Sequence, residues 1–224
     1  MARNRSNRAA LTSLLIAALA LVLMASPKQA NADRSVRVLG PEAVRSTIEA
    51  FVGPTPPRPV RVRVLPCPGD PTAQGCHSSS PKIDTIWLNP QAGGLDSETL
   101  AHEMGHVFES YMWDLRWRHV PGSDFVPTTF EQIAAILFED PPPGILYSTA
   151  WSERFAESYS ACARFEQLTE TLATHYWGFE MTPAQHELIC PLIDSMASDY
   201  EQATAPGPLR TQRHRRRPAL APVA

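Results

Sequence analysis

Two histidines and a glutamate lie close together in the segment His102-Glu103-Met104-Gly105-His106. On a helix, residues four apart share a face, so the imidazoles of His102 and His106 could bind one metal ion. The carboxylate of Glu103 would then lie beside that ion, where it can take a proton from a metal-bound water. The pattern therefore predicts a zinc hydrolase, with Zn²⁺ as the cofactor and Glu103 as the catalytic base. The alternative is a pair of structural histidines on an amphipathic helix.

The residues around this segment have the periodicity of a helix that begins after Asp96. Asp96 is a typical N-cap residue, and a negative charge at Glu98 in the first turn favours the helix dipole. Apolar side chains then recur every three or four residues and form one stripe, which consists of Leu100, Met104, Val107, Phe108 and Tyr111. We expect one helix over 97–113. Gly105 within it has two explanations, the close approach of another segment or simple tolerance of a glycine.

A catalytic zinc usually takes a third protein ligand, and the chain offers two carboxylates downstream for this role. Metzincins have a histidine soon after the motif, in the spacing H-x-x-G-x-x-H, but Glu109 and Met112 occupy the glycine and histidine positions here. The segment 151–159 instead places Glu153 and Glu157 four residues apart on one expected helical face. Like charges at this spacing repel unless a cation lies nearby, so this pair supplies the candidates for the third ligand.

The two motifs together resemble those of a known family. His102-Glu103-Met104-Gly105-His106 followed by Glu153-Arg154-Phe155-Ala156-Glu157 is similar to the gluzincin branch of the zincin metallopeptidases. The pair looks most like the H-E-F-G-H and E-F-F-A-E motifs of the lethal-factor-type toxin proteases. The resemblance covers only the two motif segments. It implies a zincin-like domain that hydrolyses peptide bonds with a zinc-activated water and uses the glutamate of the first motif as the general base.

The resemblance also implies a role for each site residue. His102 and His106 would bind zinc, and Glu153 would be the third ligand. Glu157 would accept a hydrogen bond from a ligand imidazole, which fixes the tautomer of that histidine and raises its basicity. Tyr147, six residues before Glu153, would be a catalytic residue that stabilises the oxyanion. Glu153 and Glu157 could also exchange roles.

A second zincin pattern ends near Asp124. The segment Gly122-Ser123-Asp124-Phe125 is similar to the G-T-x-D-Y pattern of aspzincins, in which an aspartate is the third zinc ligand. Its spacing from His106 is shorter than that family requires. A turn aspartate is the alternative identity for Asp124.

Residues 1–32 have the three parts of a secretory signal peptide. Basic residues come first, namely Arg3, Arg5 and Arg8. The apolar run Leu11–Met24 is too short for a membrane span, and Ala30-Asn31-Ala32 offers a small-x-small cleavage site. We therefore expect a secreted, extracellular protein with no stable membrane span after cleavage. A retained N-terminal anchor is the alternative.

The use of cysteine agrees with export. All four cysteines follow the expected cleavage site, and they allow three disulfide pairings. Cys67 and Cys76 bracket a loop rich in proline and glycine, where a local bridge would tie down a segment with little core of its own. That leaves Cys162 with Cys190, whose bridge would brace the element that carries the third ligand. The rival, a four-cysteine zinc site, lacks the C-x-x-C spacing that it needs.

Charge is distributed unevenly along a chain whose formal net charge is -3. The signal region 1–32 and the tail 205–224 are basic, so the body 33–204 is strongly acidic. An acidic body argues against a nucleic-acid partner and is compatible with a cationic peptide or protein substrate. The tail is rich in proline and arginine and has no apolar periodicity, so we expect it to be disordered.

The body 33–204 is long enough for one domain with a single core. Hydrophobic periodicity and capping signals predict further helices at 41–52, at 128–138 after the capping box Thr128-x-x-Glu131, and from Thr182 onward with a kink or break at Pro191. Alternating residues predict strands at 60–65 and 83–88. The expected fold class is α+β, a mostly helical zincin-like domain with a small sheet beside the active-site helix. The resemblance implies that the strand directly before this helix forms the edge of the cleft.

The prediction is thus a secreted zinc-dependent metallopeptidase that acts on peptides or proteins. Two other classes of function fit the same sequence. One is a secreted binding protein that has a zincin fold without turnover. The other is a disulfide-braced interaction protein that holds no metal.

Overall fold

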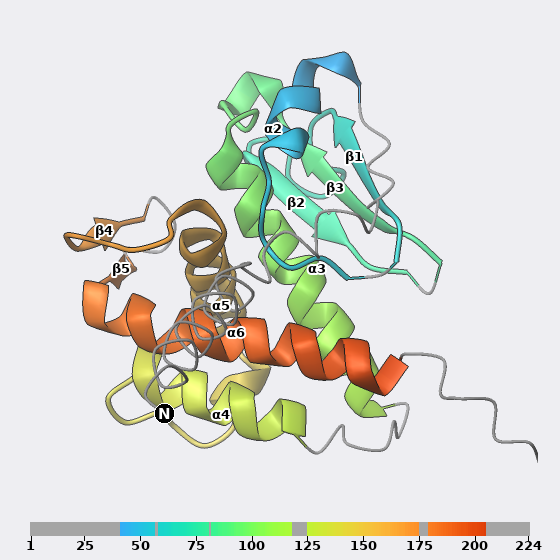
Figure 1. Cartoon of the computed structure of the whole chain (residues 1–224). Helices are drawn as coiled ribbons and strands as arrows, with labels where there is room; N and C mark the ends of the chain where they lie inside the picture. Colours follow the sequence, from blue (N-terminus) through green and yellow to red (C-terminus); the bar gives the residue numbers. More distant parts are fainter. Residues whose placement is uncertain (1–40, 57, 81, 118–124, 175–178, 205–224) are drawn as a thin grey trace, which may run out of the picture.

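In a computed structural model, the chain folds as an α+β domain around one long helix, α3 (Ser97–Trp117). The structure describes residues 41–204 except 57, 81, 118–124 and 175–178. Figure 1 shows α3 between a small sheet and a group of helices. Among these helices, α3 packs directly on α5 (Thr149–Arg164). The predicted fold class, mostly helical with a short sheet beside the helix of the first motif, is confirmed.

The main sheet has three short strands in the order β1-β3-β2. β1 (Val60–Val64) and β3 (Asp84–Leu88) are parallel, and β2 (Gly75–Ser78) is antiparallel to β3. β1 and β3 confirm the two strands that alternation predicted, because buried residues alternate with more exposed ones along both. β2 was not predicted, since its four residues, Gly-Cys-His-Ser, carry no apolar alternation.

The strand at the edge of the sheet beside the motif helix is β2. The strand directly before α3 is β3, which has β1 on one side and β2 on the other. The expectation that this strand forms the edge of the cleft is therefore wrong. The physical reason is that both edges of β3 are already paired within the sheet, whereas β2 pairs on one edge only among the residues that the structure describes.

The remaining elements are η2 (Glu42–Val44), α2 (Arg45–Glu49), η3 (Pro90–Ala92), α4 (Phe125–Leu137), η4 (Ile145–Tyr147), β4 (Leu172–Ala173), β5 (Glu180–Met181) and α6 (Pro183–Thr204). The helix predicted at 41–52 is thus a short 3₁₀ turn followed by the single-turn α2. α4 begins three residues before Thr128, so the capping box predicted there is wrong. Pro127 lies in the first turn of α4, where proline costs no intrahelical hydrogen bond.

The capping signals at the N-termini of α3 and α6 act as predicted. The Asp96 carboxylate accepts a hydrogen bond from the Thr99 backbone N–H at 2.7 Å, which caps α3. Thr182 and Gln185 exchange hydrogen bonds across the first turn of α6, with lengths of 3.0 and 3.2 Å. α6 continues through Pro191 as one helix, so this proline does not divide it.

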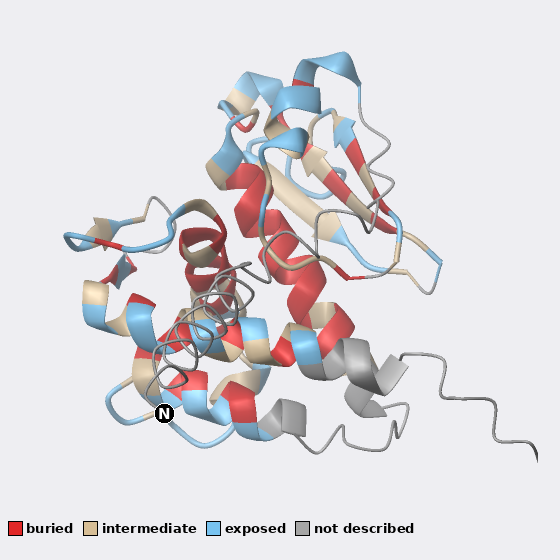
Figure 2. Cartoon of the chain, in the orientation of Figure 1, coloured by how far each residue is buried: buried red, intermediate tan, exposed pale blue. Residues whose placement is uncertain are grey.

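Both predicted disulfides are present. Cys67 is bonded to Cys76 beside the sheet, and Cys162 is bonded to Cys190, which joins α5 to α6. Cys162 lies inside α5, which is longer than the motif segment alone indicated. Figure 2 shows that α3 and α5 are the most completely buried helices, and their long shared interface carries the core.

α3 and α5 come into backbone contact at Gly105. A Cβ atom at this position would lie 2.8 Å from Ala156 Cα and 3.1 Å from both the Ala156 oxygen and Tyr159 Cβ. Of the two explanations for this glycine, close approach of another segment is therefore the right one. The contact has a consequence for the site, because Ala156 lies between Glu153 and Glu157 on α5 and both carboxylates are brought against α3.

The Gly105→Ala variant is expected to lower the free energy of unfolding by about 1–3 kcal/mol, because the added methyl group overpacks this helix contact. The loss would appear even though alanine favours an isolated helix over glycine by about 1 kcal/mol. Urea unfolding followed by circular dichroism measures it. Gly69→Ala is the control, because a Cβ at Gly69 meets nothing within 4 Å. A Gly105→Ala protein as stable as the parent would contradict the close approach.

Candidate metal centre

Three side chains from two helices converge where α3 crosses α5. His102 and His106 lie on successive turns of α3, and their Nε2 atoms are 3.1 Å apart. Glu153 comes from α5, and its Oε2 lies 3.2 Å from His102 Nε2 and 3.6 Å from His106 Nε2. The three side chains form a group whose ligand atoms lie within 4.8 Å of one another, so they could hold a metal ion.

The spacing of these atoms fits a shared cation. Ligand atoms at roughly 2.0–2.1 Å from a tetrahedral zinc lie roughly 3.3–3.4 Å from each other. The three separations between His102, His106 and Glu153 run from 3.1 to 3.6 Å and bracket that value. Two imidazoles and one carboxylate are also a donor set that divalent transition ions accept, with a further position left open.

A polar side chain lies on the outer side of each imidazole, where it can orient the inner nitrogen of that ring. Glu157 Oε1 lies 3.3 Å from His102 Nδ1, on the opposite side of the ring from Glu153. On the other ligand, His106 Nδ1 is 3.1 Å from the Ser152 hydroxyl, which itself donates to Glu109 Oε2 at 2.6 Å. A proton on each Nδ1 directs both Nε2 lone pairs into the cluster, which is the arrangement that metal-binding histidines require.

The relay from Ser152 to Glu109 was not predicted from the sequence. Glu109 follows His106 by three residues on the same helix, so its position on the ligand face could have been read from the helical spacing. Ser152 is next to Glu153, but its contact with His106 depends on how α5 packs against α3. The Ser148 hydroxyl caps α5 by accepting from the Trp151 backbone N–H at 3.1 Å, which sets where Ser152 and Glu153 begin the helix.

The electrostatics of the metal-free cluster favour a positive charge. Burial lowers the pKa of His106, but Glu109 and Glu153 outweigh this effect and raise the pKa to about 10. Burial likewise opposes protonation of His102, and the carboxylates around it nevertheless raise its pKa. Burial raises the pKa of Glu153, while the two imidazoles together hold it below its usual range. A bound metal cation would supply the positive charge that these protons provide in the metal-free cluster.

Glu103 and Tyr147 line one cavity with the three candidate ligands, and this cavity has a volume of about 700 Å³. The Glu103 residue is only 4% exposed, and burial raises the pKa of its carboxyl group. Tyr147 lines the same cavity from η4, is 70% exposed, and has its ring 5.7 Å from that of Trp113. The predicted catalytic residues and the three predicted ligands thus all line this cavity, and Glu157 lies buried behind His102.

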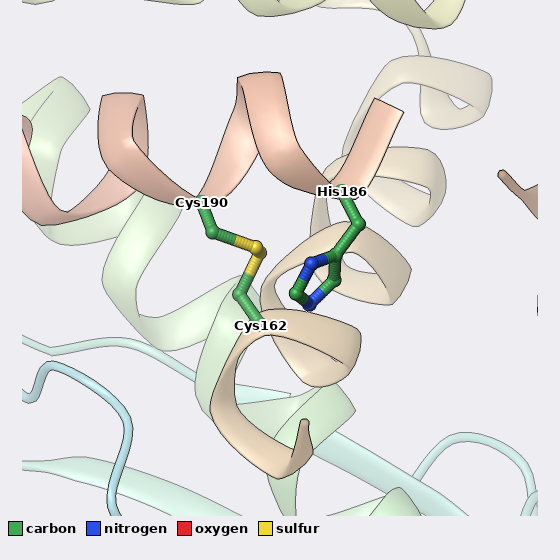
Figure 3. Close-up of side chains that lie close together, drawn as sticks. All are labelled: Cys162, His186 and Cys190. Carbon is green, nitrogen blue, oxygen red and sulfur yellow. A yellow bond between two sulfur atoms is a disulfide. The ribbon is translucent and has the colours of Figure 1, made fainter. Parts of the chain in front are cut away.

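A second group of possible ligands surrounds the Cys162–Cys190 disulfide. His186 on α6 is buried with its imidazole beside the two sulfur atoms (Figure 3), and the three side chains lie within 4.8 Å of one another. Because the sulfur atoms are bonded to each other, neither is a thiolate that could bind a metal. In this oxidised form the group is a buried disulfide with a neighbouring histidine.

Several predictions concern residues outside the described ranges. They are the signal peptide at 1–32, the alternative ligand Asp124 and the tail at 205–224. Among the residues that the structure does describe, the two disulfides fit an extracellular protein. None of the helices in this described part of the chain is both long enough and apolar enough to span a bilayer.

Comparisons with known proteins assign this chain to no family. No family model matches it, and a search of curated proteins and a search of solved structures returned no match. A proposal about function therefore rests on the two motifs and on the geometry of the cluster that they form.

Proposed function

We propose that the protein is a zinc-dependent metallopeptidase of the gluzincin type. The observation that carries the proposal is the convergence of His102, His106 and Glu153, whose ligand atoms come from two separate helices and lie within 4.8 Å of one another. Histidines with a merely structural role would not require a partly buried carboxylate against both of their Nε2 atoms. The outer contacts from Glu157 and Ser152, which orient both rings, support the same reading.

The residues of the cavity have separate tasks in this reaction. A zinc ion bound by the two histidines and Glu153 would supply a Lewis acid and lower the pKa of its water to about 7. Glu103 accepts a proton from the attacking water and passes it to the leaving amine nitrogen. Its carboxyl group is buried, which disfavours the charged form and suits it to hold that proton between the two transfers. Tyr147, which lines the same cavity, donates a hydrogen bond to the oxyanion.

The shape and charge of the cavity favour a peptide or protein substrate. It is lined by the edge strand β2 and the loop before it, by α3, and by η4 with the start of α5. The lining includes the carboxylates of Asp70, Glu103, Glu109 and Glu153, and within the described part of the chain it contains no lysine or arginine. An acidic cavity beside a sheet edge suits an extended chain with cationic side chains better than it suits a nucleic acid.

Metal analysis followed by peptide cleavage tests the proposal. The purified, disulfide-bonded protein is expected to contain about one zinc per chain and to cleave members of a peptide library. A chelator should abolish cleavage, and added zinc should restore it. Zinc without any cleavage would favour the non-catalytic binding protein. A protein that takes up no metal would favour the disulfide-braced interaction protein and overturn the proposal.

A further inference from the structure

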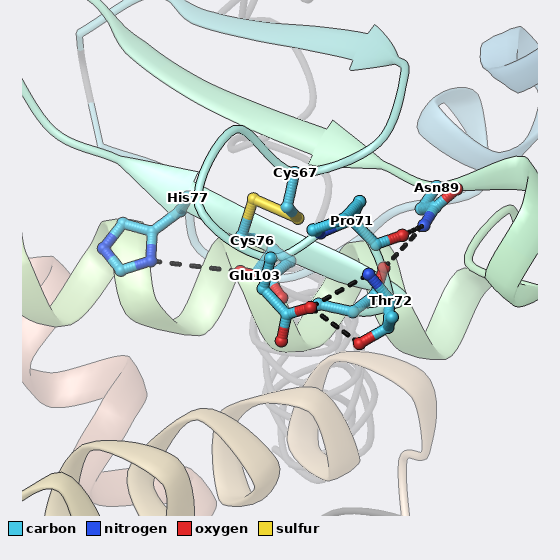
Figure 4. Close-up of a disulfide and its surroundings, with 9 residues drawn as sticks. Cys67, Pro71, Thr72, Cys76, His77, Asn89 and Glu103 are labelled. Carbon is cyan, nitrogen blue, oxygen red and sulfur yellow. Dashed lines mark hydrogen bonds and ion pairs between the residues drawn. A yellow bond between two sulfur atoms is a disulfide. The ribbon is translucent and has the colours of Figure 1, made fainter.

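A third histidine lies over the candidate metal centre. His77 is on the edge strand β2, and its ring stacks on that of His106 with centroids 5.0 Å apart and an angle of 12° between the planes. Its Nδ1 lies 3.9 Å from Glu103 Oε2 (Figure 4). His77 belongs to neither sequence motif, and no ligand atom of its ring is part of the three-residue metal group.

Glu103 needs a partner of this kind. Its Oε2 is buried, and among the described residues the structure gives this atom no hydrogen bond. A buried carboxylate oxygen without a donor is unfavourable, so one is expected to approach it during the reaction cycle. The 3.9 Å separation from His77 Nδ1 is too long for a direct hydrogen bond. One water can bridge a gap of this size, and catalytic hydrogen bonds often shorten when substrate binds.

The backbone of β2 lies directly against Glu103. A Cβ atom at Gly75 would be 2.9 Å from both Cγ and Oε1 of Glu103, and 2.7 Å from Thr99 Cγ2. Only a glycine therefore lets the strand approach the catalytic carboxylate this closely. The same approach carries His77, two residues further along the strand, to the other oxygen of Glu103.

The strand is held in this place by a rigid frame (Figure 4). Cys76, next to His77, is bonded to Cys67. The buried Asn89 side chain donates to the carbonyl oxygens of Pro71 and Ala73, with lengths of 2.8 and 2.9 Å. The Asn89 backbone N–H donates to the Gln74 carbonyl at 2.7 Å. A frame of this kind fixes where an imidazole on β2 can stand, which a solvent-exposed histidine would not need.

We propose that His77 is a positioning residue, whose Nδ1–H donates to Glu103 Oε2, directly or through one water, and orients that carboxylate for proton transfer. The inference rests on the proposed function of Glu103. It assigns the disulfide loop 67–76 a task in the site, because that loop holds the strand that carries His77. The stacking of His77 on His106 keeps its ring nearly parallel to that imidazole, so Nδ1 stays directed at the carboxylate.

Three substitutions on β2 test this role in the full, zinc-loaded protein. His77→Phe keeps a flat ring that can stack on His106 but removes the Nδ1 donor. We expect it to lower kcat by about 10–100-fold, with KM and zinc content within about twofold of the parent. His77→Asn places an amide N–H near the position of Nδ1 and should recover a large part of that loss. Ser78→Ala changes an exposed neighbour on the same strand and should leave kcat as it is.

The outcomes separate this inference from the function on which it rests. A zinc-loaded parent that cleaves no peptide refutes the proposed function and this role with it. An active parent with a fully active His77→Phe variant refutes only the role of His77. A His77→Phe variant that loses zinc also refutes only this role, because His77 would then act on the metal. A variant in which only KM changes refutes it as well, because His77 would then contact substrate. In the double variant, His77→Phe should add little to the loss that Glu103→Gln already causes.

Discussion

The Glu103→Gln variant is expected to bind zinc as the parent does and to lose peptide hydrolysis by about 10²–10⁴-fold in kcat. Glutamine has nearly the shape of glutamate, so the contact with Gly75 and the packing around Thr99 remain. What is lost is a group that can accept a proton from the attacking water and return it to the leaving nitrogen. Initial rates on a cleaved library peptide, together with zinc content measured on the same preparation, test this expectation.

The matched control for this variant is Glu187→Gln. It makes the same chemical change at an exposed position on α6, away from the cavity. It should leave both zinc content and hydrolysis unchanged. If Glu103→Gln cleaved as fast as the control, Glu103 would not be the base. If it lost its zinc, the lowered rate would say nothing about proton transfer, and Glu103 would belong to the metal site.

The Glu153→Ala variant is expected to lose zinc far more completely than Glu157→Ala. Glu153 Oε2 lies against both imidazole Nε2 atoms, where it would bind the metal directly. Glu157 contacts the outer nitrogen of His102, and removing a partner of a ligand in this way costs about 10–100-fold in metal affinity. Metal analysis of the two purified variants, followed by a competition titration with a chelator, shows which variant loses more zinc.

The isosteric pair Glu153→Gln and Glu157→Gln controls for packing. Glu157 is only 2% exposed, so alanine there leaves a cavity in the core and could loosen the site through α5. Glutamine keeps the volume, and the amide oxygen at 157 can still accept from His102 Nδ1. We therefore expect Glu157→Gln to retain more zinc than Glu157→Ala. Zinc loss that is greater in the variants of residue 157 than in those of residue 153 would exchange the two roles.

Features that depend on neighbouring residues were predictable from the sequence. The four-residue spacing of His102 and His106 places them on one face of any helix, and Asp96 caps that helix as expected. Alternation likewise predicted β1 and β3. These predictions hold because the geometry of a helix or a strand depends on residues that are only a few positions apart in the sequence. The disulfide pairs were also predictable, since composition showed which loop needed a brace.

Strand β2 shows why other features were not predictable. Its sequence has no apolar alternation, and it becomes a strand only because β3 pairs with it and the Cys67–Cys76 bridge holds its start. The family resemblance therefore implied the wrong strand as the edge of the cleft. It also missed His77, whose distance along the chain from His106 gives no sign that their rings stack.

The sequence by itself determined which side chains are available: two imidazoles and a carboxylate on one helix, and two carboxylates on another. The tertiary structure alone decided which carboxylate faces the imidazoles and which lies behind them, because α3 and α5 touch at Gly105 and this contact sets the register between Glu153 and His102. The physical reason is that spacing within a helix is a local property of the backbone. The meeting of side chains from two helices depends on how both pack against the rest of the core.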